Sequence, residues 1–115
     1  MAVSSLQVVD IIEVMENFLE KIRPPEEMRT KLDISYKIEG QSVIIAELRP
    51  KFTDPKIILE SPVAKATFVK STGYWKLYWM RANLKWVYYE PLPTVKTLKE
   101  FTVEVDKDPH GCFWG

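Results

Sequence analysis

The chain has 115 residues, of which 46% are apolar and 28% are charged, which is the size and balance of one folded domain. This composition excludes a chain that is disordered throughout, and the 16 acidic and 16 basic residues leave no net charge to attract nucleic acid or an anionic membrane. We therefore expect residues 1–115 to form a single domain, in which any attraction to a charged partner is local.

The features that report on location favour the cytoplasm. Met1 to Ser5 has no basic start, and acidic residues interrupt the apolar positions that follow, unlike the apolar stretch of a signal peptide. No run approaches the ~20 apolar residues of a membrane span. Cys112 is the only cysteine, so no intramolecular disulfide can form, as is common in a reducing compartment. The sequence predicts a cytoplasmic protein that has no membrane partner.

The N-terminal segment has the pattern of an amphipathic helix. Ser4 followed by Gln7 fits a capping box at its start, and Pro24 and Pro25 end it because proline supplies no amide donor. The second proline also suits the first position of a further short helical turn over residues 26–30. Apolar residues recur at helical spacing at Val8, Ile11, Ile12, Met15, Phe18, Leu19 and Ile22.

From Leu32 to Tyr89 the apolar period changes to two, which is typical of half-buried strands. Gly40-Gln41 is expected to close a hairpin with positive φ at the glycine, and Asp54-Pro55 to form another turn. The apolar run at residues 57–59 is too short to classify. The predicted strands cover residues 32–39, 42–49, 63–70, 74–81 and 84–89. Because short turns connect them, we expect an antiparallel meander of about five strands.

The last third of the chain is expected to add a second helix, capped by Thr94. Its apolar stripe consists of Val95, Leu98, Phe101 and Val105. A strand over residues 101–105 competes with this helix, because apolar and polar residues alternate there. Asp108 to Gly111 has the composition of a type I turn. The predicted fold class is α+β, with an N-terminal and a C-terminal helix on one face of the five-stranded meander.

Four stretches of this sequence together resemble a known family. They are E-L-R-P at 47–50, A-K at 64–65, W-K-L-Y-W-M-R-A-N-L-K-W at 75–86 and D-K-D-P-H-G-C-F-W-G at 106–115. The resemblance extends from Ile22 to the C-terminus and is to a bacterial family catalogued as domain of unknown function 3024. It implies a bacterial source, and it supplies no substrate, cofactor or catalytic residue that could be carried over.

Charge and aromatic rings are concentrated in one part of the chain. Between Glu60 and Glu90 there is no acidic residue, but there are the cations Lys65, Lys70, Lys76, Arg81 and Lys85. The same stretch contains the rings of Phe68, Tyr74, Trp75, Tyr78, Trp79, Trp86, Tyr88 and Tyr89. Cations beside aromatic faces are what proteins use to bind the phosphates and bases of single-stranded nucleic acid.

Strand alternation divides these rings into two rows. Trp75 and Trp79 are expected on one face, and Tyr74 and Tyr78 on the other. At least one row is expected in the core beneath the helices, and strand lysines also serve to keep sheet edges solvated. A nucleic-acid surface and a core with solvated charge both remain open for this stretch.

Glu47, Arg49, Lys65 and Arg81 form a second candidate site. Each interrupts an otherwise apolar strand, and a charge among apolar neighbours needs a partner. A cross-strand ionic network that sets the strand register would explain them. The functional alternative is a site for an anion or carboxylate, with Arg49 as its anchor.

Residues that could support catalysis or bind a metal follow no recognised pattern. His110 and Cys112 lie two apart at a turn near the chain end, whereas a thiol and its base usually come from separate parts of a fold. With Asp106 and Asp108 they lack the paired spacing of zinc ligands. Glycine-rich phosphate loops and H-E-x-x-H are absent from the sequence. We expect no catalytic residue, no metal and no cofactor; an enzyme would use Cys112 or a carboxylate such as Glu47.

The two terminal rings, Phe113 and Trp114, have two interpretations. They pack back onto the sheet, or they are exposed and contact another subunit, since aromatic residues are favoured at interfaces.

Our functional hypothesis is a non-catalytic binding or interaction module that uses the aromatic and basic face of residues 75–86. A small anionic ligand, a protein partner and single-stranded nucleic acid all fit this hypothesis, and a homo-oligomer is a further option. An enzyme with a carboxylate or cysteine site is the remaining alternative. The residues expected to contribute to binding are Glu47, Arg49, Lys65, Trp75, Lys76, Trp79, Arg81, Lys85 and Trp86.

Overall fold

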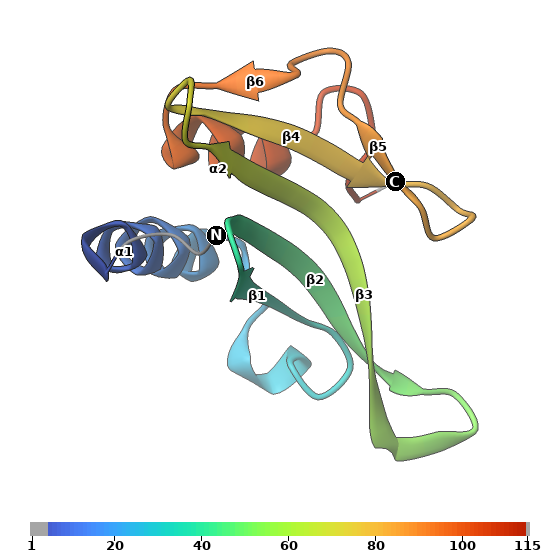
Figure 1. Cartoon of the computed structure of the whole chain (residues 1–115). Helices are drawn as coiled ribbons and strands as arrows, with labels where there is room; N and C mark the ends of the chain where they lie inside the picture. The colour runs from blue at the N-terminus through green and yellow to red at the C-terminus, as the bar shows by residue number, and fades with distance from the viewer. Residues whose placement is uncertain (1–4, 115) are drawn as a thin grey trace.

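A helix, a curved antiparallel sheet and a second helix follow one another along the chain (Figure 1). The computed structural model describes residues 5–114, with side chains from residue 7 onward. This order confirms the predicted α+β class, while the expected cap at Ser4 lies outside the described residues. The elements are α1 (Ser5–Ile22), η1 (Glu26–Met28), β1 (Asp33–Glu39), β2 (Ser42–Lys51), β3 (Asp54–Val69), β4 (Tyr74–Met80), β5 (Trp86–Tyr88), β6 (Thr94–Val95) and α2 (Leu98–Lys107).

Helix α1 and the turn after it follow the predicted pattern. Ile11, Met15 and Phe18 are buried on the side of the helix that faces the sheet. The amide of Arg23 makes the last helical bond, to the carbonyl of Leu19, and the two prolines then end the helix. The 3-10 turn η1 follows directly and leads the chain into β1. No helix in the described part of the chain is both long enough and apolar enough to cross a membrane.

An ion pair between Arg23 and Asp33 joins the end of α1 to the start of β1. Arg23 donates from Nε and Nη2 to the two carboxylate oxygens, at 2.8 and 2.6 Å. The hydrogen bond from Arg23 lowers the pKa of Asp33, opposed by partial burial and assisted by the amide of Ile34. This two-point contact fixes the direction in which the chain leaves the helix.

Replacing Arg23 by Gln is expected to lower the free energy of unfolding at neutral pH. It should also reduce the dependence of that free energy on pH in the acidic range. Because the pKa of Asp33 is depressed in the folded state, the pair stabilises fully above the unfolded value of about 3.9, and this stabilisation is lost as the pH falls through the folded pKa. The pair is partly exposed, so the loss should be about 1 kcal/mol. Urea unfolding from about pH 2 to pH 7 measures it. A loss of unfolding free energy that is the same at every pH would contradict the assignment of this stabilisation to the ion pair.

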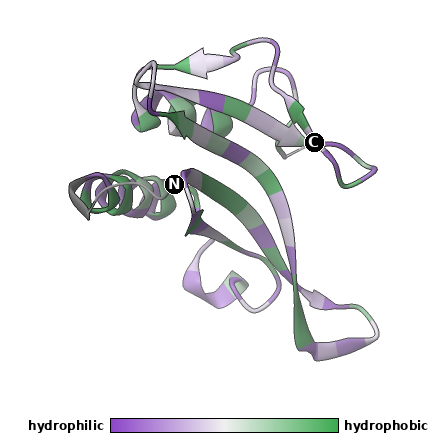
Figure 2. Cartoon of the chain, viewed as in Figure 1, coloured by the Kyte–Doolittle hydropathy of each residue, from purple (hydrophilic) through white to green (hydrophobic). Residues whose placement is uncertain are grey.

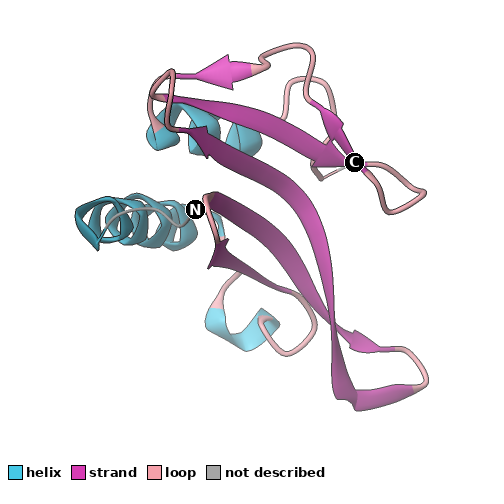
Figure 3. Cartoon of the chain, viewed as in Figure 1, coloured by secondary structure: helices cyan, strands magenta, loops and turns pink. Residues whose placement is uncertain are grey.

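The strands form a meander in the order β1-β2-β3-β4-β5, and the short strand β6 pairs with the same edge of β4 as β5, nearer the start of β4 (Figure 3). Gly40 has φ of +62° in the two-residue turn between β1 and β2, as predicted. The next turn was placed wrongly at Asp54-Pro55. Lys51 pairs with Asp54, so Phe52 and Thr53 make the turn, and β3 runs through residues 57–59 that the sequence left unclassified.

Residues 94–107 form a strand and then a helix, which corrects the predicted start of that helix. Val95 pairs with Trp75 of β4, so Thr94 belongs to β6 and does not cap α2. The cap is Thr97, whose hydroxyl accepts from the amide of Glu100 at 3.3 Å. The carboxylate of Glu100 in turn accepts from the amide of Lys96, the residue before the cap, and so also holds the start of the helix. The helix is confirmed and the competing strand over residues 101–105 is wrong.

Both helices cover the same face of the sheet and share one core. Residues from α1, the sheet, α2 and the C-terminal segment belong to a single buried cluster, which confirms the predicted arrangement. Its members are Ile11, Met15, Phe18, Ile34, Val43, Ile45, Ala64, Ala66, Trp75, Leu77, Tyr89, Val95, Leu98, Phe101, Val105 and Phe113. Apolar and polar residues alternate along the central strands (Figure 2). The face that the helices leave uncovered therefore carries more polar side chains, such as Lys65 and Lys76.

The C-terminal rings pack against the body of the protein. Phe113 is buried against Tyr89, with ring centroids 4.8 Å apart, and Trp114 donates its indole N–H to the carbonyl of Val105 at 2.8 Å. The carboxylate of Asp108 accepts from both amides of the pair, at 3.1 and 3.0 Å. The amide of Gly111 bonds to the carbonyl of Asp108, as expected for the predicted turn. Packing onto the fold is therefore the correct interpretation of Phe113 and Trp114.

Candidate functional site

Strand β4 presents its tryptophans and its tyrosines to opposite sides of the sheet. Trp75 is only 5% exposed in the core, and Trp79 packs against the same core from its margin. Tyr74 and Tyr78 point the other way, with the lysine between them. The tyrosine row is therefore the one that reaches solvent, on the sheet face that the helices leave uncovered.

Five side chains gather on this uncovered face, and we name them the lysine–tyrosine face: Lys65, Lys76, Tyr78, Trp86 and Tyr88. The strand register brings them together, because Lys65 of β3 lies opposite Tyr78 of β4, which lies opposite Tyr88 of β5. Trp86, two residues before Tyr88, shares its side of the sheet. Rings from two strands and lysines from two strands thus form one surface.

Cation–π contacts organise this face. The ammonium of Lys65 lies 4.6 Å from the ring centroid of Tyr78 and 4.9 Å from that of Trp86. The ammonium of Lys76 lies 5.8 Å from the ring centroid of Tyr88. The rings of Tyr78 and Tyr88 stack with centroids 5.0 Å apart and an interplanar angle of 24°. Such contacts lie within the range where a cation is attracted to an aromatic face.

The charge of Lys65 is balanced only in part, by the carboxylate of Glu39. Partial burial lowers the pKa of Lys65, and the more distant Glu39 opposes that shift. Among residues 7–114, no acidic side chain forms an ion pair with Lys65 or Lys76. Burial also raises the pKa of Tyr78, with a contribution from a hydrogen bond to Tyr88. The face therefore combines two lysines with the stacked rings of Tyr78 and Tyr88.

The other residues predicted around β4 lie elsewhere. Arg81 stacks over Trp79, with its guanidinium carbon 5.9 Å from the ring centroid, at the margin of the covered face. Lys85 is exposed in the turn between β4 and β5, where its amide bonds to the side chain of Asn83. Trp75 is a core residue and offers no surface to a ligand. Of the predicted set, Lys65, Lys76 and Trp86 come together on the lysine–tyrosine face.

The second predicted cluster is not brought together. Glu47 pairs with Arg49 two residues along the same strand, with 3.2 Å between Arg49 Nε and Glu47 Oε2. Glu47 lies opposite Ile34, which is in the helix-covered core, whereas Lys65 lies opposite Ile44 on the other side of the sheet. An anion site built from Glu47, Arg49 and Lys65 is therefore not formed, because sheet alternation separates them.

Tyr78 and Tyr88 were absent from the residues predicted to bind, although they lie at the centre of this face. The sequence contained a partial signal, since both belong to the alternating strands of residues 74–89. What it lacked was the register between β4 and β5, which places Tyr78 directly opposite Tyr88. Two tyrosines ten residues apart become neighbours only through that pairing.

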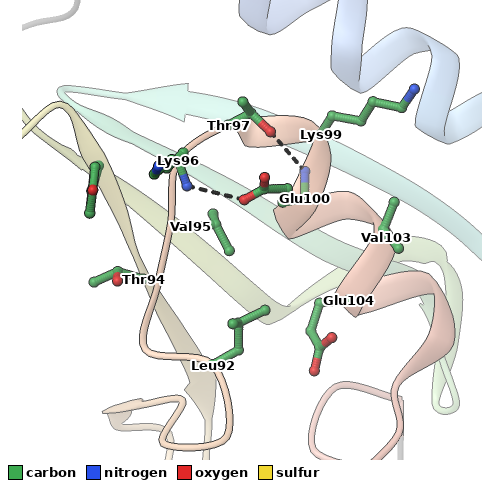
Figure 4. Close-up of a pocket in the computed structure, with 10 residues that line it drawn as sticks. Leu92, Thr94, Val95, Lys96, Thr97, Lys99, Glu100, Val103 and Glu104 are labelled. Carbon is green, nitrogen blue, oxygen red and sulfur yellow. Dashed lines mark hydrogen bonds between the residues drawn. The ribbon is translucent and has the colours of Figure 1, made fainter.

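A pocket of about 810 Å³ lies between β6, the start of α2 and Tyr74, and none of the predicted binding residues lines it (Figure 4). Leu92, Val95 and Val103 supply apolar walls. Both acids in its lining are already engaged: Glu100 accepts from the amide of Lys96, and Glu104 accepts from the phenol of Tyr89 at 2.6 Å. The sequence did not indicate this pocket, because it depends on where α2 begins.

Cys112 and His110 do not form an activated pair. The thiol lies 3.9 Å from the backbone carbonyl of His110, and the imidazole ring lies edge-on to Tyr89 at 6.3 Å between centroids. Burial raises the pKa of Cys112, with Asp108 adding to the shift, and this favours the thiol over the reactive thiolate. Within the portion of the chain that the structure describes, no three His, Cys, Asp or Glu side chains are grouped to bind a metal.

Comparison with known proteins identifies the family of this chain. The model of the family described as a domain of unknown function, DUF3024, matches residues 3–115. No curated protein and no solved structure matches the chain. The match includes β3, β4, β5 and the C-terminal segment, and with them every residue of the lysine–tyrosine face. The chain therefore belongs to the DUF3024 family.

Proposed function

We propose that this protein is a non-catalytic binding module that holds an anionic ligand on its lysine–tyrosine face. The observation that supports this most directly is the position of Lys65 between two aromatic rings, where no carboxylate of residues 7–114 forms an ion pair with it. Burying part of a cation carries a free-energy cost, and a bound anion would offset it. The neighbouring Lys76 adds a second positive charge on the same face.

The local distribution of charge supports the same proposal. Residues 61–89 contain no acid, although the whole chain has no net charge. A positive patch surrounded by low-dielectric aromatic groups attracts an anion more strongly than an isolated surface lysine does. The hydroxyl of Tyr78, whose pKa is raised by burial, can donate a hydrogen bond to the ligand. Phosphate or carboxylate oxygens have the matching chemistry.

Single-stranded nucleic acid is the second candidate ligand, favoured by the exposure of the tyrosines. Tyr88 is 50% exposed beside Lys76, and Tyr74 is also exposed on the adjoining strand. Bases stack on such rings while lysines contact the phosphates, and the interaction tolerates many sequences.

We place this activity in the cytoplasm, because a lone cysteine is typical of a reducing compartment.

Replacing Lys65 by Met is expected to weaken binding of an anionic ligand about tenfold while leaving the fold intact. Methionine preserves the apolar stem between Tyr78 and Trp86 and removes the charge, and a charged hydrogen bond contributes roughly 1.5–3 kcal/mol. Titration of the purified protein with phosphate, small carboxylates and labelled single-stranded oligonucleotides measures the effect. Binding of an oligonucleotide should also fall steeply with added salt.

The matched control for this experiment is Lys31→Gln, which removes one exposed positive charge outside the face. It should leave the affinity within about twofold of the unaltered protein. An equal loss in both variants would show that only net charge matters and would contradict a site at Lys65. No response to any ligand of the panel at high protein concentration would overturn the proposed function.

A further inference from the structure

The β2–β3 hairpin forms an arm that projects beyond the region covered by the helices (Figure 1). Strand β3 has 16 residues, but β4 pairs with it only from Ala64 to Val69. From Lys56 to Pro62, the described structure gives β3 a neighbour on one side alone, namely β2. The other edge of this segment therefore has backbone N–H and C=O groups available to a further strand.

The free segment is apolar as well as unpaired. Ile57, Ile58 and Leu59 follow one another along it, and Ile58 is 55% exposed. Figure 2 colours this part of β3 as hydrophobic, at the end of the arm away from the helices. Because side chains alternate along a strand, Ile57 and Leu59 lie on one face of the arm and Ile58 lies on the other, so both faces are apolar at the free edge. Exposed apolar strands at a sheet edge are favourable positions for pairing with another chain.

The sequence of the segment is complementary to itself when it runs antiparallel. With Ile58 placed opposite the partner's Ile58, Lys56 lies opposite the partner's Glu60, and Ile57 lies opposite the partner's Leu59. Two-fold symmetry then repeats each pair, giving two ion pairs that flank a central pair of isoleucines. Opposite charges and apolar pairs directly across antiparallel strands are both stabilising.

Prolines limit how far such a pairing could extend. Pro55 precedes the segment and Pro62 follows it, and neither residue has an amide proton to donate. Pairing is therefore confined to the six residues between them. A bounded edge of this kind favours a closed pair of chains over an open-ended stack of strands.

We propose that two copies of this chain associate through the free edge of β3, with Ile58 at the two-fold axis and Lys56 facing the partner's Glu60. The two hairpin arms join into one four-stranded sheet. Glu60 already contacts Lys37 of its own chain at 3.4 Å, through Oε1, and its second oxygen is available to the partner. Because one pair of short strands is a small interface, the association is reversible and depends on protein concentration.

Sedimentation equilibrium over a range of concentrations tests this association with the full chain. The unaltered protein should shift from a single 13.4 kDa chain to a dimer as the concentration rises. Lys56→Glu places two acids opposite each other at both ends of the interface, so the dissociation constant should rise roughly tenfold. The double variant Lys56→Glu with Glu60→Lys exchanges the two charges and should restore dimerisation.

A second variant separates this interface from a general effect of apolar surface. Ile58→Arg places two positive charges at the axis and should leave only monomer, while circular dichroism shows an unchanged fold, since Ile58 is exposed. The control Val9→Arg changes an equally exposed apolar residue on α1 and should leave dimerisation unaltered. A chain that stays monomeric at every concentration would overturn the proposal. So would a failure of the charge-exchanged double variant to dimerise, because it would exclude this register.

Discussion

Replacing Phe101 by Ala is expected to lower the free energy of unfolding by about 3–5 kcal/mol, which is a large part of the stability of a domain of this size. Phe101 is fully buried in α2, within the core that this helix shares with α1 and the sheet. Removing its ring leaves a cavity among the buried residues of this core, which relax only partly to fill it. Urea unfolding followed by circular dichroism measures the loss.

The matched control is Val103→Ala, two residues along the same helix. Val103 is 42% exposed, so its truncation should cost less than about 1 kcal/mol. The pair of variants tests the orientation of α2, which the sequence alone left in competition with a strand. Similar losses in both variants would contradict the helix, because residues 101 and 103 share a side only in a strand.

Removing residues 113–115 is expected to destabilise the protein by about 3 kcal/mol or more. The deletion exposes Tyr89, against which Phe113 packs, and it leaves the carboxylate of Asp108 without the two amides that bond to it. It also removes the indole bond to the carbonyl of Val105. Thermal unfolding of dilute protein measures the effect, which should appear as a large fall in Tm.

Trp114→Phe is the milder variant that accompanies this deletion. It keeps an aromatic ring at the position and removes the N–H that donates to Val105 together with part of the indole, so the loss should be about 1–2 kcal/mol. Dimerisation through β3 should persist in Trp114→Phe, since the arm is separate from the C-terminal segment. A deletion that preserved Tm while abolishing self-association would contradict the packed arrangement and favour exposed rings that bind another subunit.

Local pattern predicted the elements whose signals do not depend on distant residues. The helical spacing before Pro24 predicted α1, because an apolar stripe and a proline stop act within one segment. Alternation from residue 32 to residue 89 predicted the strands, and Gly40 predicted the first turn because glycine adopts positive φ at little cost. These features confirm the fold class, while the binding function remains a prediction.

Sequence signals failed where two local structures fit equally well. Residues 101–105 satisfy both a helical stripe and strand alternation, and the choice came from capping by Thr97 and packing of Phe101 beneath the sheet. Asp54-Pro55 has the composition of a turn, yet the pairing of Lys51 with Asp54 moved the turn to the two residues before it. In both places long-range contacts decided between conformations of similar local energy.

The sequence by itself determined which residues alternate, and so which rings and charges had to lie on a common side of each strand. Only the tertiary structure decided which side the helices cover, and this placed Trp75 in the core and Tyr78 beside Lys65. Strand register likewise separated Glu47 from Lys65, and the short length of β4 left the edge of β3 free. The physical reason is that alternation is a property of one strand, whereas burial and pairing depend on neighbours contributed by distant parts of the chain.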